Sequence, residues 1–127
     1  MTEKTSKKLF IRSKVWIEDE HGEVVFGLGR IRILEAVDRL GSLQAAAKEL
    51  KMGYRAIWGR IRATEERLGE PLLVRTIGGS SGGGSQLTPF ARMLLEQFKA
   101  LHREILSYSD NHFQQNCRLI DKAPDKE

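Results

Sequence analysis

The sequence is poor in the residues that disulfides and metal centres require. Cys117 is the only cysteine in the 127 residues, so neither an intramolecular disulfide nor a thiolate metal cluster can form. The histidines, at positions 21, 102 and 112, have no metal-ligand spacing to one another or to Cys117. We therefore expect no bound metal and no cofactor, and a reducing cytoplasm as the location.

Long apolar runs are also absent. No stretch approaches the roughly 18 apolar residues that a membrane span needs. The polar residues 1–8 lead into neither an apolar segment nor a cleavage site, which argues against a secretory signal. We expect a flexible N-terminus over 1–8, one domain over 9–108, a polar tail over 109–127 and no membrane partner.

Catalytic patterns are missing as well. The glycine-rich run 78–85 invites a nucleotide-binding interpretation, but a P-loop needs a lysine after its last glycine. No lysine lies between Arg75 and Lys99, and the carboxylates are scattered over charged segments. The sequence gives no support for an enzyme.

Positive charge, by contrast, is concentrated in the middle of the chain. Residues 29–77 contain ten basic and six acidic residues, most of the basic ones arginine, whereas both flanking regions are balanced. The whole formal surplus of +4 therefore lies in this stretch. Arginine suits bidentate contact with phosphate or guanine, so the distribution favours a nucleic-acid partner.

Hydrophobic periodicity predicts two types of element in the first half of the chain. Alternating apolar residues over 9–18, turn residues and an apolar return indicate a β-hairpin over 9–27. Helical spacing and end signals then predict helices over 30–40, 42–51 and 54–68, with Gly41 as the stop of the first helix and Ser42 as the N-cap of the second. Two short helices joined by a tight turn at Met52-Gly53, with small residues at Ala45–Ala47 for close crossing, indicate a helix-turn-helix.

The second half predicts a wing and a long helix. Two short strands flank the glycine-serine run, which gives a wing over 71–88, and Thr88-Pro89 starts a helix over 89–108. Its apolar residues recur in steps of three or four and form a seam that is too long for one small domain to cover. We therefore expect a homodimer interface along this seam: Phe90, Leu94, Phe98, Leu101 and Ile105. The predicted fold class is mainly α with small β, a winged helix-turn-helix with an N-terminal β-hairpin and a long C-terminal dimerisation helix.

The exposed face of the third helix is the predicted reader of double-stranded DNA. It carries a stripe suited to the major groove: Tyr54, Arg55, Trp58, Gly59 and Arg62. The arginines can bind guanine or phosphate, and Tyr54 can donate to phosphate. Gly59 costs about 1 kcal/mol relative to alanine inside a helix, which is consistent with close approach to a groove wall. Two alternatives stay open for Trp58: base contact, or packing under the wing.

Further candidate DNA contacts flank this helix. Free N–H groups at a helix N-terminus favour anions, which makes Ser42 and Gln44 candidates for phosphate contact, and Lys51 lies in the turn. The wing adds a basic residue at its base and backbone N–H groups at its tip: Arg75, Gly79, Ser80, Ser81 and Gly82.

Three segments together resemble a known family. Residues 42–50, 54–61 and 65–73 are similar to the LysR-type helix-turn-helix and, more closely, to the N-terminal DNA-binding domain of molybdate-responsive transcriptional regulators. Tyr54, Arg55 and Trp58 in the third helix and the long glycine-serine tip favour this branch. The resemblance covers residues 9–108 and implies a dimer formed by the long helices, holding an operator against the second and third helices and the wing.

The chain departs from that family at its C-terminus. Family members carry oxyanion-binding domains after the DNA-binding part, and the sequence has no room for them, which indicates a stand-alone form whose effector is unknown. We predict a homodimeric, sequence-specific regulator, with a link to molybdenum, tungsten or anaerobic metabolism resting on the resemblance alone. The alternatives are a winged-helix protein-interaction module and a direct molybdate or tungstate sensor.

Overall fold

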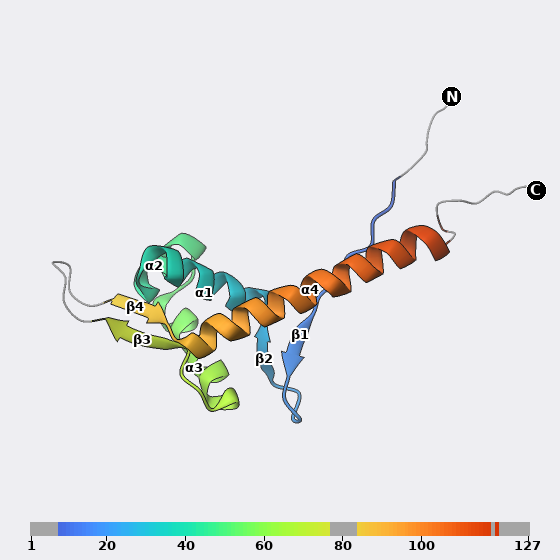
Figure 1. Cartoon of the computed structure of the whole chain (residues 1–127). Coiled ribbons are helices and arrows are strands. Elements are labelled where there is room, and N and C mark those ends of the chain that lie inside the picture. Colours follow the sequence, from blue (N-terminus) through green and yellow to red (C-terminus); the bar gives the residue numbers. More distant parts are fainter. Residues whose placement is uncertain (1–7, 77–83, 118, 120–127) are drawn as a thin grey trace, which may run out of the picture. The chain divides into compact units, whose positions relative to one another are not determined.

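The computed structural model describes residues 8–76, 84–117 and 119, and these form four strands and four helices (Figure 1). In chain order the elements are β1 (Trp16–Glu18), β2 (Val24–Gly27), α1 (Leu28–Leu40), α2 (Leu43–Leu50), α3 (Tyr54–Leu68), β3 (Leu73–Thr76), β4 (Gly84–Leu87) and α4 (Pro89–Asn116). None of the described helices contains an apolar stretch long enough to cross a membrane. The fold is the predicted one, mainly helical with a small β component and a winged helix-turn-helix arrangement. Two compact units are present, Val15–Lys99 and a second that contains residues 8–14 and 100–117.

The N-terminal hairpin is shorter than the sequence predicts. The first strand begins at Trp16 rather than at residue 9, and all three residues of β1 are exposed. β2 is only four residues long and is followed at once by α1, so residues 9–15 have no strand partner in the described part of the chain. The Asp19 carboxylate closes the turn by accepting from the backbone N–H groups of His21 (2.8 Å) and Glu23 (3.0 Å).

Helices α1, α2 and α3 enclose the core of the larger unit with β2. Five large side chains are buried almost completely: Phe26, Ile33, Leu34, Val37 and Ile57. Ala46 and Ala47 are buried on α2, which confirms the expected small residues at the helix crossing. The predicted helix end at Gly41 is also confirmed, with φ +83° and a bond from its N–H to the Val37 carbonyl.

The turn between α2 and α3 differs from expectation in its geometry. The left-handed residue is Lys51, with φ +57°, whereas Gly53 is extended and precedes the first turn of α3. The Lys51 N–H binds the Lys48 carbonyl at 3.2 Å, and the Met52 N–H binds the Ala47 carbonyl at 2.9 Å, closing the end of α2. The reversal therefore begins one residue before the predicted Met52-Gly53 break.

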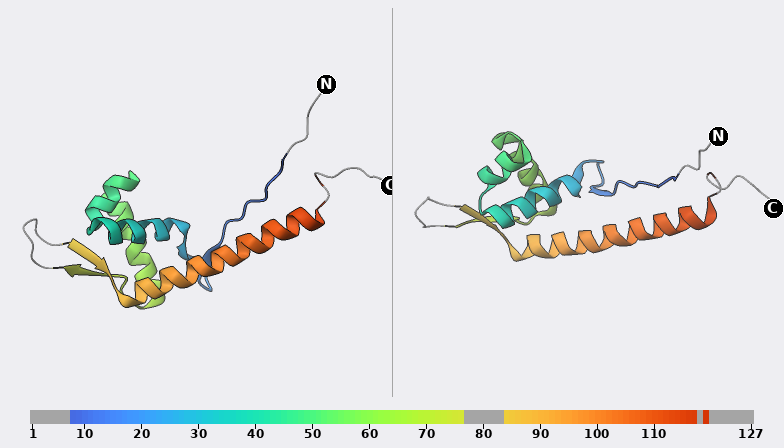
Figure 2. Two further views of the ribbon diagram at one scale, coloured as in Figure 1. Left: turned by 45° about the horizontal axis from the view of Figure 1, so that its top comes forward. Right: turned by 90° about the horizontal axis from the view of Figure 1, so that it is seen from above.

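The wing is a two-stranded antiparallel ribbon. Leu73 pairs with Leu87 and Thr76 with Gly84, and both views of Figure 2 show β3 and β4 side by side. The Ser85 N–H donates to the Gly41 carbonyl (2.8 Å), which joins β4 to the turn between α1 and α2. The wing base is thereby fixed beside the start of α2.

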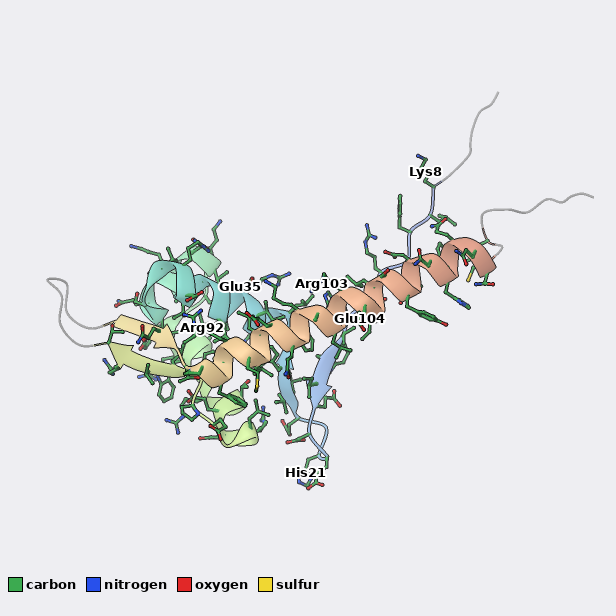
Figure 3. All side chains as sticks on the ribbon, viewed as in Figure 1. Lys8, His21, Glu35, Arg92, Arg103 and Glu104 are labelled. Carbon is green, nitrogen blue, oxygen red and sulfur yellow. The ribbon has the colours of Figure 1, made fainter. Side chains whose placement is uncertain are left out.

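The first turns of α4 complete the core. Thr88 is the predicted N-cap: its hydroxyl accepts from the Ala91 N–H (3.0 Å) and donates to the Pro71 carbonyl (2.8 Å). Phe98 is 3% exposed and packs edge-on against Phe26, with ring centroids 5.5 Å apart. Arg92 pairs with Asp38 of α1, as Lys99 does with Glu35; Figure 3 labels Arg92 and Glu35.

α4 is eight residues longer than predicted, ending at Asn116 instead of at residue 108. Polar composition after Ser109 suggested a tail, but Phe113 continues the helical spacing from Ile105 and is buried. Within the second unit, Ser13 donates to Ser109 (3.5 Å), and the Gln114 amide donates to the Leu9 carbonyl (3.4 Å). The expected terminal segments 1–7, 118 and 120–127 lie outside the described residues.

Candidate nucleic-acid interface

A polar groove of 460 Å³ lies where α2, α3 and the wing base meet. Six residues predicted from the sequence to contact DNA line it: Ser42, Gln44, Tyr54, Trp58, Arg62 and Arg75. Between them the walls also contain Leu43, Ile61, Glu65, Leu73, Val74, Gly84 and Ser85. The fold thus brings together predicted contact residues that are up to 33 positions apart in the sequence.

The α2 end of the groove is a capped helix N-terminus. The Ser42 hydroxyl accepts from the Ala45 N–H at 3.0 Å, which confirms the predicted N-cap. The adjacent Gln44 side chain is exposed. A helix N-terminus presents backbone donors and a partial positive charge, so this end of the groove suits a phosphate.

α3 presents two exposed aromatic rings. Tyr54 is 48% and Trp58 44% exposed, so Trp58 is not buried under the wing. Arg55 does not line the main groove; it borders a separate depression of 340 Å³ with Tyr54 and Trp58. Gly59 is exposed, and a Cβ there would meet no atom within 4 Å. The fold itself therefore imposes no steric need for glycine at this position.

Arg62 is held on the same helix by two neighbours. Its guanidinium carbon lies 4.9 Å from the centroid of the Trp58 ring, and its Nη2 donates to the Glu66 carboxylate at 3.1 Å. Both contacts span one helical turn. The contact with Glu66 was not predicted, although an arginine four residues before a glutamate is a readable signal for it.

Glu65 is a second residue that the sequence analysis missed. Its carboxylate accepts from the backbone N–H groups of Leu72 (2.7 Å) and Leu73 (3.4 Å), at the start of the wing. This contact fixes the wing to α3 as the Ser85–Gly41 bond fixes it to α2. Nothing in the local spacing identifies a carboxylate that binds backbone donors seven and eight residues later.

Charge is distributed unequally around this surface. Ion pairs neutralise Arg39 with Glu49 and Arg67 with Glu23. Hydrogen bonding between Arg39 and Glu49 raises the pKa of Arg39 and lowers the pKa of Glu49, so both stay charged at neutral pH. No described carboxylate lies within ion-pair distance of the exposed cations of α2, α3 and the wing: Lys48, Lys51, Arg55, Arg60 and Arg75.

Four predicted contact residues fall outside the described part of the wing: Gly79, Ser80, Ser81 and Gly82. No group of three His, Cys, Asp or Glu among the described residues is arranged to hold a metal ion. His21 lies at the tip of the hairpin in Figure 3, with Glu20 beside it at 3.5 Å.

The predicted dimer seam requires a correction at Phe98. This side chain is buried in the core of its own chain, and Phe90 and Leu94 are half-buried against the same core. Leu101 remains 47% exposed and Ile105 is half-buried. Leu101 and Ile105 are therefore the members of the expected seam on which a dimer proposal can still rest.

Comparison with known proteins adds a family match. The model of the bacterial regulatory helix-turn-helix proteins, lysR family, matches residues 28–92, from α1 to the first residues of α4. A solved structure of ArgP from Mycobacterium tuberculosis is similar to 63% of the chain and 29% of its own, with 30% identity and a TM-score of 0.45.

Three curated relatives carry names linked to molybdenum or to transcription. The chain is 43% identical over 81 residues to the molybdenum transport protein ModE of Azotobacter vinelandii, covering 64% of this chain. It is 38% identical over 74 residues to the transcriptional regulator ModE of Haemophilus influenzae, covering 58% of this chain. It is 36% identical over 75 residues to the molybdenum-pterin-binding protein MopB of Rhodobacter capsulatus, covering 59% of this chain. The matches span between 28% and 30% of the length of these relatives.

Proposed function

Because the chain belongs to the lysR family of bacterial regulatory helix-turn-helix proteins, we propose that it is a transcription regulator that binds double-stranded DNA sequence-specifically as a homodimer in the cytoplasm. One observation carries the DNA-binding proposal. The groove that joins α2, α3 and the wing base gathers six predicted contact residues, and one of them, Arg75, has no described carboxylate within ion-pair distance.

The three walls of the groove suit two kinds of DNA contact, to bases and to phosphates. α3 offers Arg62 and Trp58 to the base edges of the major groove, as a recognition helix does. The N-terminus of α2, at Ser42 and Gln44, and Arg75 of the wing are placed for phosphates on either side. Phosphate contacts set the position of the domain, and base contacts set its specificity.

The names of the relatives suggest the genes that the protein controls. Two of the three described above are named for molybdenum, and the third is a transcriptional regulator. We infer that target genes belong to molybdenum- or tungsten-related metabolism.

Footprinting of the full chain on fragments from its own gene neighbourhood, over a salt series, tests the proposal. We expect a protected two-fold-symmetric site whose affinity is at least about 10³-fold above that of random DNA. Arg62→Ala should weaken that site by about 1–3 kcal/mol, whereas Arg103→Ala removes one exposed charge from α4 and should change it little. Binding of equal strength to all sequences that is lost at moderate salt would reject a specific regulator and favour a protein-interaction module.

A further inference from the structure

Three side chains form a stacked and ion-paired row on α3. Trp58, Arg62 and Glu66 follow at intervals of four residues, which places them on one face of the helix. The Arg62 guanidinium lies over the Trp58 ring at 4.9 Å and donates to Glu66 at 3.1 Å. Trp58 and Arg62 also line the groove with Ser42 and Arg75.

This arrangement leaves much of the guanidinium available to a ligand. Arginine has five N–H donors in one plane, and guanine needs two of them for its O6 and N7 acceptors. Stacking on an aromatic ring restrains the plane, and a carboxylate on one nitrogen restrains rotation within it. A side chain that is already restrained loses less conformational entropy when it binds.

Arg55 lacks these supports. It makes no ion pair with a described carboxylate, and it borders the separate depression at the start of α3 rather than the main groove. Its charge suits phosphate, which requires no fixed plane.

On the basis of the proposed function, we propose that Trp58 and Glu66 hold Arg62 as a preformed reader of guanine. Arg62 is the specificity-determining residue, whereas Trp58 and Glu66 are positioning residues. Arg55 contributes affinity that is largely independent of the base.

Because Glu66 is negatively charged, its substitution should change the affinity for random DNA and the discrimination between bases in opposite directions. A carboxylate near DNA repels phosphate, so Glu66→Gln raises affinity for random DNA. The same substitution weakens the hold on Arg62 and lowers discrimination between guanine and the other bases. A carboxylate that acted only through its charge would change affinity for all sequences alike.

Selection of binding sites from a random duplex library, with the full chain, identifies the base that Arg62 reads. We expect the wild type to select a guanine at one position of each half-site. Replacement of that guanine should cost the wild type about 5- to 150-fold in affinity. In Arg62→Ala, which removes the donors to guanine, this preference should fall below about 3-fold.

The positioning residues are tested on the same site. Trp58→Ala and Glu66→Gln should each reduce the preference for that guanine, and Trp58→Phe should preserve most of it because a ring remains beneath the guanidinium. Arg55→Ala is the matched control on the same helix: it should weaken binding to all sequences and keep the preference for guanine. Urea unfolding of each variant confirms that the domain is folded.

The outcomes distinguish a failure of the proposed function from a failure of the role assigned to Arg62. If the wild type selects no motif, the proposed function fails, and this inference fails with it. If the wild type selects a motif that Arg62→Ala leaves unchanged, or if Arg55→Ala loses the preference for guanine instead, only the assignment of Arg62 is overturned. A Glu66→Gln variant that keeps its full preference for guanine overturns the positioning role.

Discussion

At the residue scale, Lys51 occupies the left-handed region of backbone conformation at φ +57°, where a residue with a Cβ is strained. The cost for a non-glycine residue is about 1–2 kcal/mol. Gly59 shows the opposite case: it lies inside a helix at a position where a Cβ has open space. At both positions the residue present is not the one that gives the most stable fold, and both residues lie on the proposed DNA-binding elements.

Lys51→Gly should stabilise the fold and weaken DNA binding. Glycine removes the left-handed strain, and we expect a gain of about 0.5–1 kcal/mol in the free energy of unfolding after the entropy of glycine is included. Loss of an exposed cation should reduce the dependence of log K on log[salt] by about one unit. Urea unfolding and DNA titration measure both effects. Lys51→Gln, which removes the charge and keeps the strain, should weaken binding without the gain in stability.

Gly59→Ala should likewise raise stability, by about 0.5–1 kcal/mol, because alanine is the better helix former. If α3 lies close to a groove wall at this position, the added methyl group lowers operator affinity. We therefore expect the variant to have a higher free energy of unfolding in urea and a lower affinity for its operator in a DNA titration. A variant that gains stability and keeps full affinity would show that Gly59 has no role in the approach to DNA.

At the scale of elements, the wing is positioned by the turn between α1 and α2. Gly84 lies so close to Gly41 that an added Cβ would be 2.4 Å from the Gly41 carbonyl oxygen. Ser85 uses the same carbonyl as its hydrogen-bond acceptor. Neither β4 nor the turn can therefore move independently at this point.

Gly84→Ala should displace β4 from this turn and destabilise the domain by about 1–3 kcal/mol, as overpacking does. Gly59→Ala is the matched control, because the same added methyl group meets no neighbour there. The contribution of Arg75 to DNA affinity should also shrink in the Gly84→Ala background, which a double-mutant cycle measures. Additive effects of the two substitutions would contradict the coupling of the wing base to the groove.

Phe98→Ala should destabilise the domain by about 3–5 kcal/mol, the usual cost of removing a buried aromatic side chain. Phe98 and Phe26 contact edge to face, so their rings would be separated by a cavity. Leu101→Ala, on the exposed part of the same helix, should cost less than about 1 kcal/mol. Equal costs in thermal or urea unfolding would contradict the assignment of Phe98 to the core.

Sequence predicts these elements well where the signal is local and poorly where it depends on a distant partner. Ser42 and Thr88 are N-caps and Gly41 ends α1 as predicted, because a cap acts on residues within one turn. The strand predicted from residue 9 begins only at Trp16, since β2 is too short to pair with the rest. Six residues that line the groove are among the predicted DNA contacts, but Glu65 is not, because its backbone partners belong to the wing.

At the scale of the whole molecule, the proposed homodimer requires an exposed apolar surface. Leu101 is the side chain of the predicted seam that is most exposed in the described structure. Leu101→Glu should therefore shift the protein from dimer to monomer in sedimentation and leave its unfolding free energy per monomer nearly unchanged. Arg103→Ala, at an exposed position on the opposite side of the helix, serves as control. An intact Leu101→Glu dimer would exclude this face as the interface.

Carboxylates compensate Arg39 of α1 and Arg92 and Lys99 of α4, whereas no described carboxylate pairs with Lys48, Arg55 or Arg75. Apart from Arg32, the exposed cations between α1 and Lys99 that have no described ion-pair partner therefore lie on the helix-turn-helix and the wing. The electric field of a polyanion orients a domain with this charge distribution while the domain is still diffusing towards the polyanion. The association rate then falls steeply with ionic strength, and the lifetime of the complex depends mainly on the contacts made inside the groove.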